Sequence, residues 1–168
     1  MKIMLFYFFT LSSFSFFSQS KFPDWDKNYI LKNLNTVLSE EINYSKKIQK
    51  DTTAVMYYIA ATKIRFLSKF TGNVRKINQN NIDSMDRVFM TKFGKKNFTK
   101  TIVDHEYEFV ANDTKIWMPI QKVLEDDFLK EINKNASVLL YTLHLNEHTS
   151  ERQLFNHFLI SEFSKDWQ

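Results

Sequence analysis

The segment His144-Leu145-Asn146-Glu147-His148 combines the residue types that bind zinc and activate water. Two histidines four residues apart lie on one side of a helical turn, where both imidazoles can bind the same Zn²⁺. The glutamate beside the second histidine can then act as general base on the metal-bound water. If the segment is helical, its spacing predicts a zinc-dependent hydrolase with His144 and His148 as ligands and Glu147 as base.

This H-x-x-E-H pattern resembles the active-site motif of the pitrilysin-like metallopeptidases over these five residues. The resemblance implies a third ligand, a glutamate many tens of residues downstream, and a catalytic domain much larger than this chain. Only the 20 residues 149–168 follow His148, and the run 138–145 predicts a strand, in which the histidines share no helical turn. We therefore favour an interpretation with no metal, no other cofactor and no assigned catalytic residue, and keep the zinc site as the alternative.

Two further histidines, His105 and His157, fall in predicted strands. Either imidazole could approach His144 across a sheet, and three histidines on a sheet can hold zinc. Nothing in their spacing requires this arrangement, because a histidine in a strand is usually a half-buried or rim residue. We therefore favour a structural role for both.

Paired carboxylates are the other candidates for acid–base chemistry. Glu106 and Glu108 share one face of a predicted strand, about 7 Å apart by strand rise, and Asp126-Asp127 form a second pair. A solvated sheet face explains the first pair more simply. The chain has no cysteine, which excludes thiol catalysis. Its only glycines, Gly72 and Gly94, are too few for a Rossmann or P-loop phosphate site.

Residues 1–18 have the layout of a secretory signal peptide. Lys2 supplies the positive charge, a short apolar run follows, and Ser18 is the small residue at the cleavage point before Gln19. The residues Phe16-Phe17-Ser18-Gln19 resemble the signal-peptide ends of exported Bacteroidota proteins. We therefore expect a periplasmic or secreted protein of the bacterial cell envelope, with residues 19–168 as one domain. An uncleaved N-terminal anchor is the alternative, although the run falls short of the about 20 apolar residues of a membrane span.

The formal net charge of +4 is mostly spread along the chain, with two local clusters of lysine. The clusters are Lys46-Lys47 with Lys50, and Lys92 with Lys95-Lys96 and Lys100. A nucleic-acid interface would interleave such lysines with exposed aromatic rings, and Phe93 and Phe98 do flank the second cluster. We interpret the lysines as a solvated face beside core aromatics. Because export also argues against it, we expect no nucleic-acid partner.

The hydrophobic pattern predicts an α+β fold. Helical spacing indicates helices at 24–50, 51–70, 80–93 and 123–132. The β-branched and aromatic content of 51–70 leaves a strand over part of that segment as an alternative. Alternating or continuous apolar runs indicate strands at 101–110, 115–121, 136–145 and 154–163, paired as two hairpins. The expected architecture is two or three N-terminal helices followed by an antiparallel sheet of about four strands with one inserted helix. A small open barrel is an alternative form of this sheet, and the strand order is left open.

Residues 116–121 and 158–163 resemble segments of small exported bacterial proteins of unknown function. Together with the aromatic content of 16% and the scarcity of catalytic patterns, this favours a non-enzymatic envelope protein. Its partner would be another protein or a small apolar ligand, and no stable membrane span is expected once the leader is removed. The zinc hydrolase is the alternative function, and a structural accessory of the envelope is the third.

Overall fold

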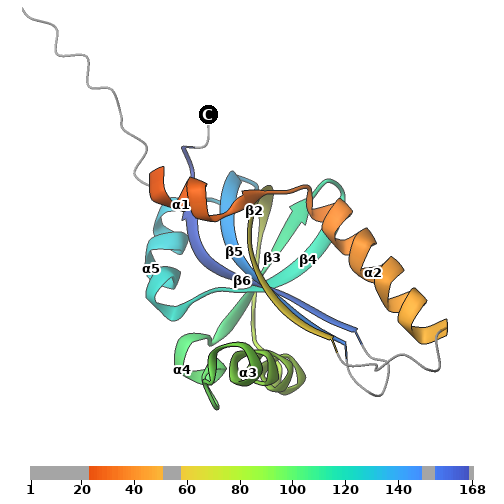
Figure 1. Ribbon diagram of the computed structural model, residues 1–168. Helices are drawn as coiled ribbons and strands as arrows, with labels where there is room; N and C mark the ends of the chain where they lie inside the picture. Colours follow the sequence, from red (N-terminus) through yellow and green to blue (C-terminus); the bar gives the residue numbers. More distant parts are fainter. Residues whose placement is uncertain (1–22, 51–57, 149–153, 167–168) are drawn as a thin grey trace, which may run out of the picture.

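The computed structural model describes residues 23–50, 58–148 and 154–166. The predicted signal peptide and its cleavage after Ser18 lie outside these residues. Within them the chain forms an α+β fold with five helices and a six-stranded sheet (Figure 1). The helices are α1 (Pro23–Asn28), α2 (Leu34–Lys50), α3 (Gln79–Phe93), α4 (Thr99–Ile102) and α5 (Lys122–Glu131). The strands are β1 (Ile30–Leu31), β2 (Tyr58–Lys76), β3 (His105–Ala111), β4 (Thr114–Pro119), β5 (Ser137–His148) and β6 (Leu154–Ser164).

The sheet has the order β4-β3-β2-β5-β6, and β1 pairs separately with β2. All neighbours along this path are antiparallel, whereas β1 runs parallel to β2. The sheet curls, so that Ile120, just after β4, forms a parallel bridge with Ile160 of β6. The α+β class and the antiparallel sheet are therefore confirmed, but the expected numbers of strands and helices were too small.

The helix predicted over 51–70 is wrong, because 58–70 belong to the long strand β2. Burial along β2 alternates, with Ile64, Phe66, Ser68 and Phe70 buried and the residues between them more exposed. Phe66 and Phe70 are four residues apart, a spacing that keeps two side chains on one face of a helix and of a strand alike. Helical periodicity alone could not separate the two. Residues 51–57 of this prediction lie outside the described residues.

The single helix predicted over 24–50 is also wrong, because the chain breaks it into α1, β1 and α2. Ile30 and Leu31, two apolar residues within the predicted helix, pair with β2 instead and are 63% and 64% exposed. The side chain of Asn33 accepts a hydrogen bond from the Thr36 N–H at 3.3 Å and so caps the start of α2. This cap favours a new helix start at that point rather than a continuous helix.

The later predictions agree closely with the structure. The helix at 80–93 is α3, which the Asn78 side chain caps and which ends at Gly94 with φ of 67°. The helix at 123–132 is α5, and the strands at 115–121, 136–145 and 154–163 are β4, β5 and β6. The strand predicted at 101–110 begins later, as β3, because its first residues belong to α4.

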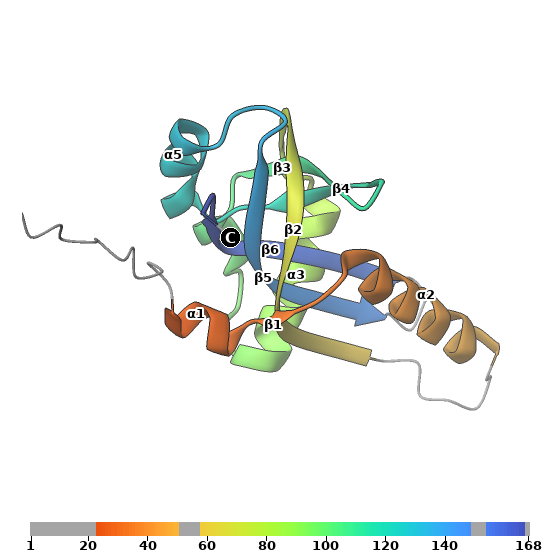
Figure 2. The same ribbon diagram turned by 90° about the horizontal axis from the view of Figure 1, so that it is seen from above.

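Helices lie on both sides of the sheet (Figure 2). We call inner the face that carries Phe66, Leu140 and Phe158, against which α2 and α5 pack. The outer face carries Leu145 and Leu159 and packs against α3 and α4, while Trp25 of α1 and Tyr29, just after α1, contact Tyr141. Among the described residues, no helix combines the length and the apolar character that crossing a membrane requires.

Phe128 of α5 is central to the apolar half of the inner face. Its ring is fully buried and packs edge-on against four other aromatic rings, those of Phe70, Tyr107, Phe109 and Phe163. We predict that Phe128→Ala lowers the free energy of unfolding by about 3–5 kcal/mol in denaturant titration, because the lost ring leaves a cavity. Leu129→Ala, one residue along and 54% exposed, is the control and should change it by less than about 0.5 kcal/mol. Equal effects of the two substitutions would contradict this packing.

Candidate functional site

The inner face of β5 changes from apolar to polar along the strand. Val138 and Leu140 belong to the apolar core, but the next four inward positions carry polar side chains that are all buried. These are Thr142, His144, Asn146 and His148. A strand whose inward positions are polar cannot gain the usual hydrophobic stabilisation there. We therefore take this polar half of the inner face as the candidate functional site.

A chain of hydrogen bonds links the site across three strands and a helix. The Asn146 amide nitrogen donates to Glu41 Oε2 of α2 at 2.7 Å and to Asn156 Oδ1 of β6 at 2.8 Å. His144 Nε2 lies 3.0 Å from the same Asn156 oxygen, and His144 Nδ1 lies 3.5 Å from Thr62 Oγ1 of β2. Because the Asn156 oxygen can only accept, the His144 proton is assigned to Nε2. The network thus extends from the exposed Thr62 to the half-buried Glu41.

One acceptor in this network is unused. Asn146 Oδ1 is buried and has no hydrogen-bond partner among the described residues. A buried polar atom left in this state costs about 1–3 kcal/mol. The amide nitrogen of the same side chain donates both of its hydrogen bonds, to Glu41 and to Asn156. The site therefore has an unpaired acceptor beside the carboxylate of Glu41.

Burial shapes the charges of the site. Burial lowers the pKa of His144, and the hydrogen bond with Asn156 only partly offsets this, so the imidazole is neutral at neutral pH. Burial raises the pKa of Glu41, which the hydrogen bond from Asn146 opposes and the charge of Glu40 reinforces. The His144 ring stacks on Phe158, with ring centroids 4.5 Å apart and planes at 6°. The acid is therefore the only charged group in the network, and it is partly desolvated.

Glu147 does not face this site. Since successive side chains of a strand point to opposite faces, Glu147 lies on the outer face while His144 and His148 lie on the inner one. Its carboxylate is fully buried and accepts hydrogen bonds from Arg87 Nε at 2.6 Å, Arg87 Nη2 at 2.7 Å and Ser84 Oγ at 3.0 Å. The strand predicted here is confirmed, and the H-x-x-E-H segment has no helical turn on which its two histidines and glutamate could converge.

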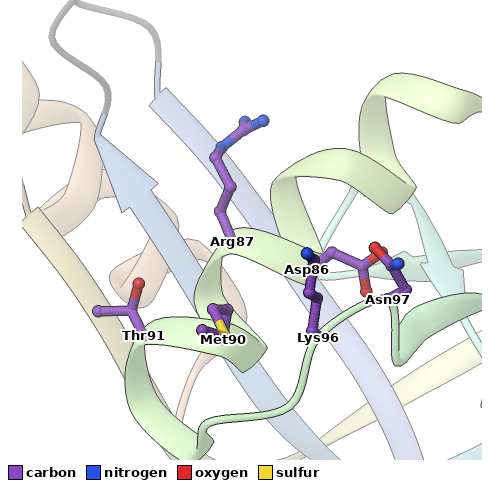
Figure 3. A pocket seen from close by; sticks show the side chains of 6 residues that line it. All are labelled: Asp86, Arg87, Met90, Thr91, Lys96 and Asn97. Carbon is purple, nitrogen blue, oxygen red and sulfur yellow. The ribbon is translucent and has the colours of Figure 1, made fainter.

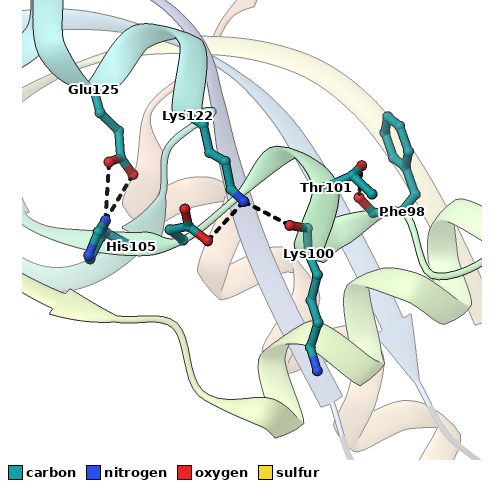
Figure 4. A network of polar contacts seen from close by, with 7 residues as sticks. Phe98, Lys100, Thr101, His105, Lys122 and Glu125 are labelled. Carbon is teal, nitrogen blue, oxygen red and sulfur yellow. Dashed lines mark hydrogen bonds and ion pairs between the residues drawn. The ribbon is translucent and has the colours of Figure 1, made fainter.

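The other histidines are not brought to the same point. His157 pairs with Leu145 across β5 and β6 and therefore lies on the outer face. His105 Nδ1 lies 3.1 Å from Glu125 Oε2 of α5, next to the ion pair of Lys122 with Asp104 (Figure 4). Within the described ranges, no three histidine, aspartate or glutamate side chains are grouped closely enough to hold a metal ion.

The acidic pairs are also separate from the site. Glu106 is 1% exposed and paired with Arg75 at 2.9 Å, so a solvated face does not explain it. Glu108 receives a hydrogen bond from Asn73 at 2.8 Å, which is the main reason that its pKa is lowered. Asp126 and Asp127 are exposed on α5. Both carboxylates of the Glu106 and Glu108 pair are therefore bound by neighbouring side chains of the fold.

Sequence reasoning missed Glu41, Asn156 and Thr62, which complete the network. The only signal available was the alternation of polar residues at 142, 144, 146 and 148 within a mostly apolar strand. No protein-family model, no curated protein and no solved structure matches this chain. The assignment of the site therefore depends on its geometry.

His157 makes the stability of the fold dependent on pH. Burial lowers its pKa from 6.5 to about 4, and the positive charges of protonated His144 and of Arg87 add to this effect. Between these values the unfolded chain binds a proton that the folded chain does not, so stability falls as the pH falls. We predict that the wild-type chain loses about 2 kcal/mol more than His157→Leu between about pH 7.5 and about pH 5 in urea titrations.

His105→Leu is the control for this prediction, because His105 is partly exposed and bound to Glu125. This variant should retain the full loss of stability at the lower pH. The assignment to His157 would be disproved if His157→Leu and the wild-type chain lost the same stability.

Proposed function

We propose that the protein is an exported, non-enzymatic binding module that takes a small amphiphilic amine into the polar half of its inner face. The observation that carries this proposal is the buried Asn146 Oδ1, which has no partner among the described residues and belongs to a side chain bonded to Glu41. A purely structural network would be expected to use this acceptor, because leaving it unpaired is costly. An N–H group of a ligand would donate a hydrogen bond to this Asn146 oxygen.

The charges favour an ammonium group over other donors. An ammonium has three N–H donors and no acceptor, which suits a site that offers an amide carbonyl beside a carboxylate. Burial raises the pKa of Glu41, and a bound cation would favour its ionised form. The neutral His144 would not repel such a cation, since its pKa is lowered by burial.

The buried aromatic side chains beside the network favour an apolar body for the ligand. Beyond His144 the inner face continues into Phe158, whose ring lies 5.8 Å from that of Phe66 in an edge-on arrangement. The amine would thus be held at the polar end with its hydrocarbon directed toward aromatic side chains. The exposed Thr62 and the half-buried Glu41 and Asn156 are the points at which the network reaches solvent, and they are the entry points that we propose.

A zinc hydrolase is not supported by the same residues. The glutamate that would act as base is held on the opposite face by Arg87 and Ser84. The network of the inner face has a neutral histidine and a carboxylate, but they are joined through two asparagine amides rather than directly. An amide neither gains nor loses a proton at neutral pH, so this arrangement favours binding over proton transfer.

We predict that n-butylammonium binds the chain more tightly than n-butanol or butyrate when titrated calorimetrically. The three probes share their apolar body and differ only in the head group, so the ranking reports the chemistry of the site. Asn146→Leu should abolish the preference for the amine, and Glu41→Gln should weaken amine binding about tenfold or more, as the loss of a charge-assisted hydrogen bond would.

Asn43→Leu is the matched control, because Asn43 is exposed on the same helix as Glu41. It should bind n-butylammonium like the wild-type chain, and circular dichroism should show that all three variants are folded. The proposal fails if the three probes bind equally or not at all, or if Asn146→Leu binds the amine unchanged.

A further inference from the structure

We propose that the surface formed by residues 90–100 docks the protein on an anionic lipid bilayer. This segment comprises the end of α3, the turn after it and the start of α4. It is separate from the polar network described above, which lies on the inner face, whereas α3 and α4 cover the outer face. The inference is therefore independent of the proposed amine site.

Four lysines of this segment are exposed, and none forms an ion pair with a described residue. They are Lys92, Lys95, Lys96 and Lys100. Lys92 lies in the last turn of α3, where a cation is favoured by the helix dipole. The other three follow the helix, so capping of α3 does not account for them. The segment thus concentrates positive charge that no carboxylate of a described residue pairs with.

Apolar side chains stand among these lysines. Met90 is 52% exposed and Phe93 is 49% exposed, and both belong to the last turns of α3. The Phe98 ring is half-buried and lies beneath Lys95, whose ammonium is 4.1 Å from the ring centroid. Exposed apolar groups surrounded by lysines are the composition of an interfacial membrane-binding surface, where the apolar groups enter the headgroup region.

A shallow hollow of about 250 Å³ opens in the same surface (Figure 3). Its lining residues are Asp86, Arg87, Met90, Thr91, Lys96 and Asn97. Asp86 is the acidic group here, and one of its oxygens accepts a hydrogen bond from the Thr99 N–H at 2.7 Å. Arg87 is engaged by Glu147. The hollow therefore offers the Lys96 ammonium together with the polar groups of Thr91 and Asn97 to a headgroup.

A bilayer fits this surface better than an acidic protein does. Protein interfaces are enriched in arginine and depleted in lysine, because lysine binds without fixed geometry. A field of lipid phosphates needs no fixed geometry, and each lysine near an anionic membrane contributes independently. An exported protein, as the leader predicts, would also meet membranes. The chemistry to be recognised is thus a surface of phosphate headgroups.

The test is flotation of the full-length chain with vesicles made of equal parts phosphatidylglycerol and phosphatidylcholine. We expect binding that weakens as salt rises, and little binding to vesicles of phosphatidylcholine alone. Replacing Lys92, Lys95, Lys96 and Lys100 with glutamine should lower the partition coefficient about tenfold or more. Met90→Ser combined with Phe93→Ser should weaken binding while leaving its salt dependence in place.

The matched control replaces Lys32, Lys46, Lys47 and Lys50 with glutamine, four exposed lysines that lie outside this surface. Both fourfold variants take the formal net charge from +4 to 0, since +4 − 4 = 0, and both keep residues 1–18, so any contribution of the leader is common to them. Equal losses in the two variants would mean that net charge alone governs binding and would overturn the proposal. The proposal would also be overturned if the variant at Lys92, Lys95, Lys96 and Lys100 kept its binding to vesicles. Binding of the chain to poly-glutamate in place of vesicles would overturn it as well.

Discussion

The pairing of β2 along both of its edges is the constraint on which the rest of the fold depends. Residues 58–69 of β2 pair with β5, and residues 69–76 pair with β3, with a shift of register between Phe70 and Val74. Gly72 lies in this irregularity with φ of +87°, a conformation that side chains other than glycine rarely adopt. A Cβ there would also lie 2.9 Å from the side chain of Lys134. One strand therefore joins the two parts of the sheet and aligns the inner face of both.

That inner face is divided into an apolar half and a polar half. Its apolar half is closed by Phe128 of α5 and by Leu34 and Val37 of α2, all buried. Its polar half is covered by the later part of α2, from which Glu41 reaches Asn146. Because the two halves share strands β2, β5 and β6, the apolar half can hold the strands in place while the polar half carries groups that stabilise little. A buried polar network on a rigid sheet is the arrangement that preorganises a binding site.

The outer face has a different character. Its core includes Met85, Val88 and Phe89 of α3, and it buries the Glu147 carboxylate that pairs with Arg87. Glu147 is fully buried whereas the Arg87 side chain is 44% exposed, so the arginine links the interior to the surface. The end of the same helix carries Met90, Phe93 and the lysines beyond them. Figure 1 shows α2 and α3 on different sides of the strands, so the inner site and the lysine-bearing surface do not compete for space.

Capping and turn residues in the sequence were sufficient to predict an element whose ends are set by its own residues. Asn78 and Gly94 delimit α3, and the turn at Asn112-Asp113, both with positive φ, separates β3 from β4. The same signals failed for β2. Its side chains at 66 and 70 satisfy helical and extended spacing alike, and only pairing with two distant strands favours the extended form. Hydrogen bonding between strands is a property of the folded chain, which no window of sequence contains.

The sequence by itself determined the α+β class, the strand that carries His144 and the residue types available for chemistry. The tertiary structure decided which of those residues meet. The H-x-x-E-H segment placed His144 and Glu147 next to each other along the chain, yet the alternation of the strand directs them to opposite faces. Asn146 instead meets Glu41, 105 residues away, and Asn156, 10 residues away across β5 and β6. A site on a sheet is assembled across strands and from the helix above them, so its members are set by register and packing rather than by spacing along one segment.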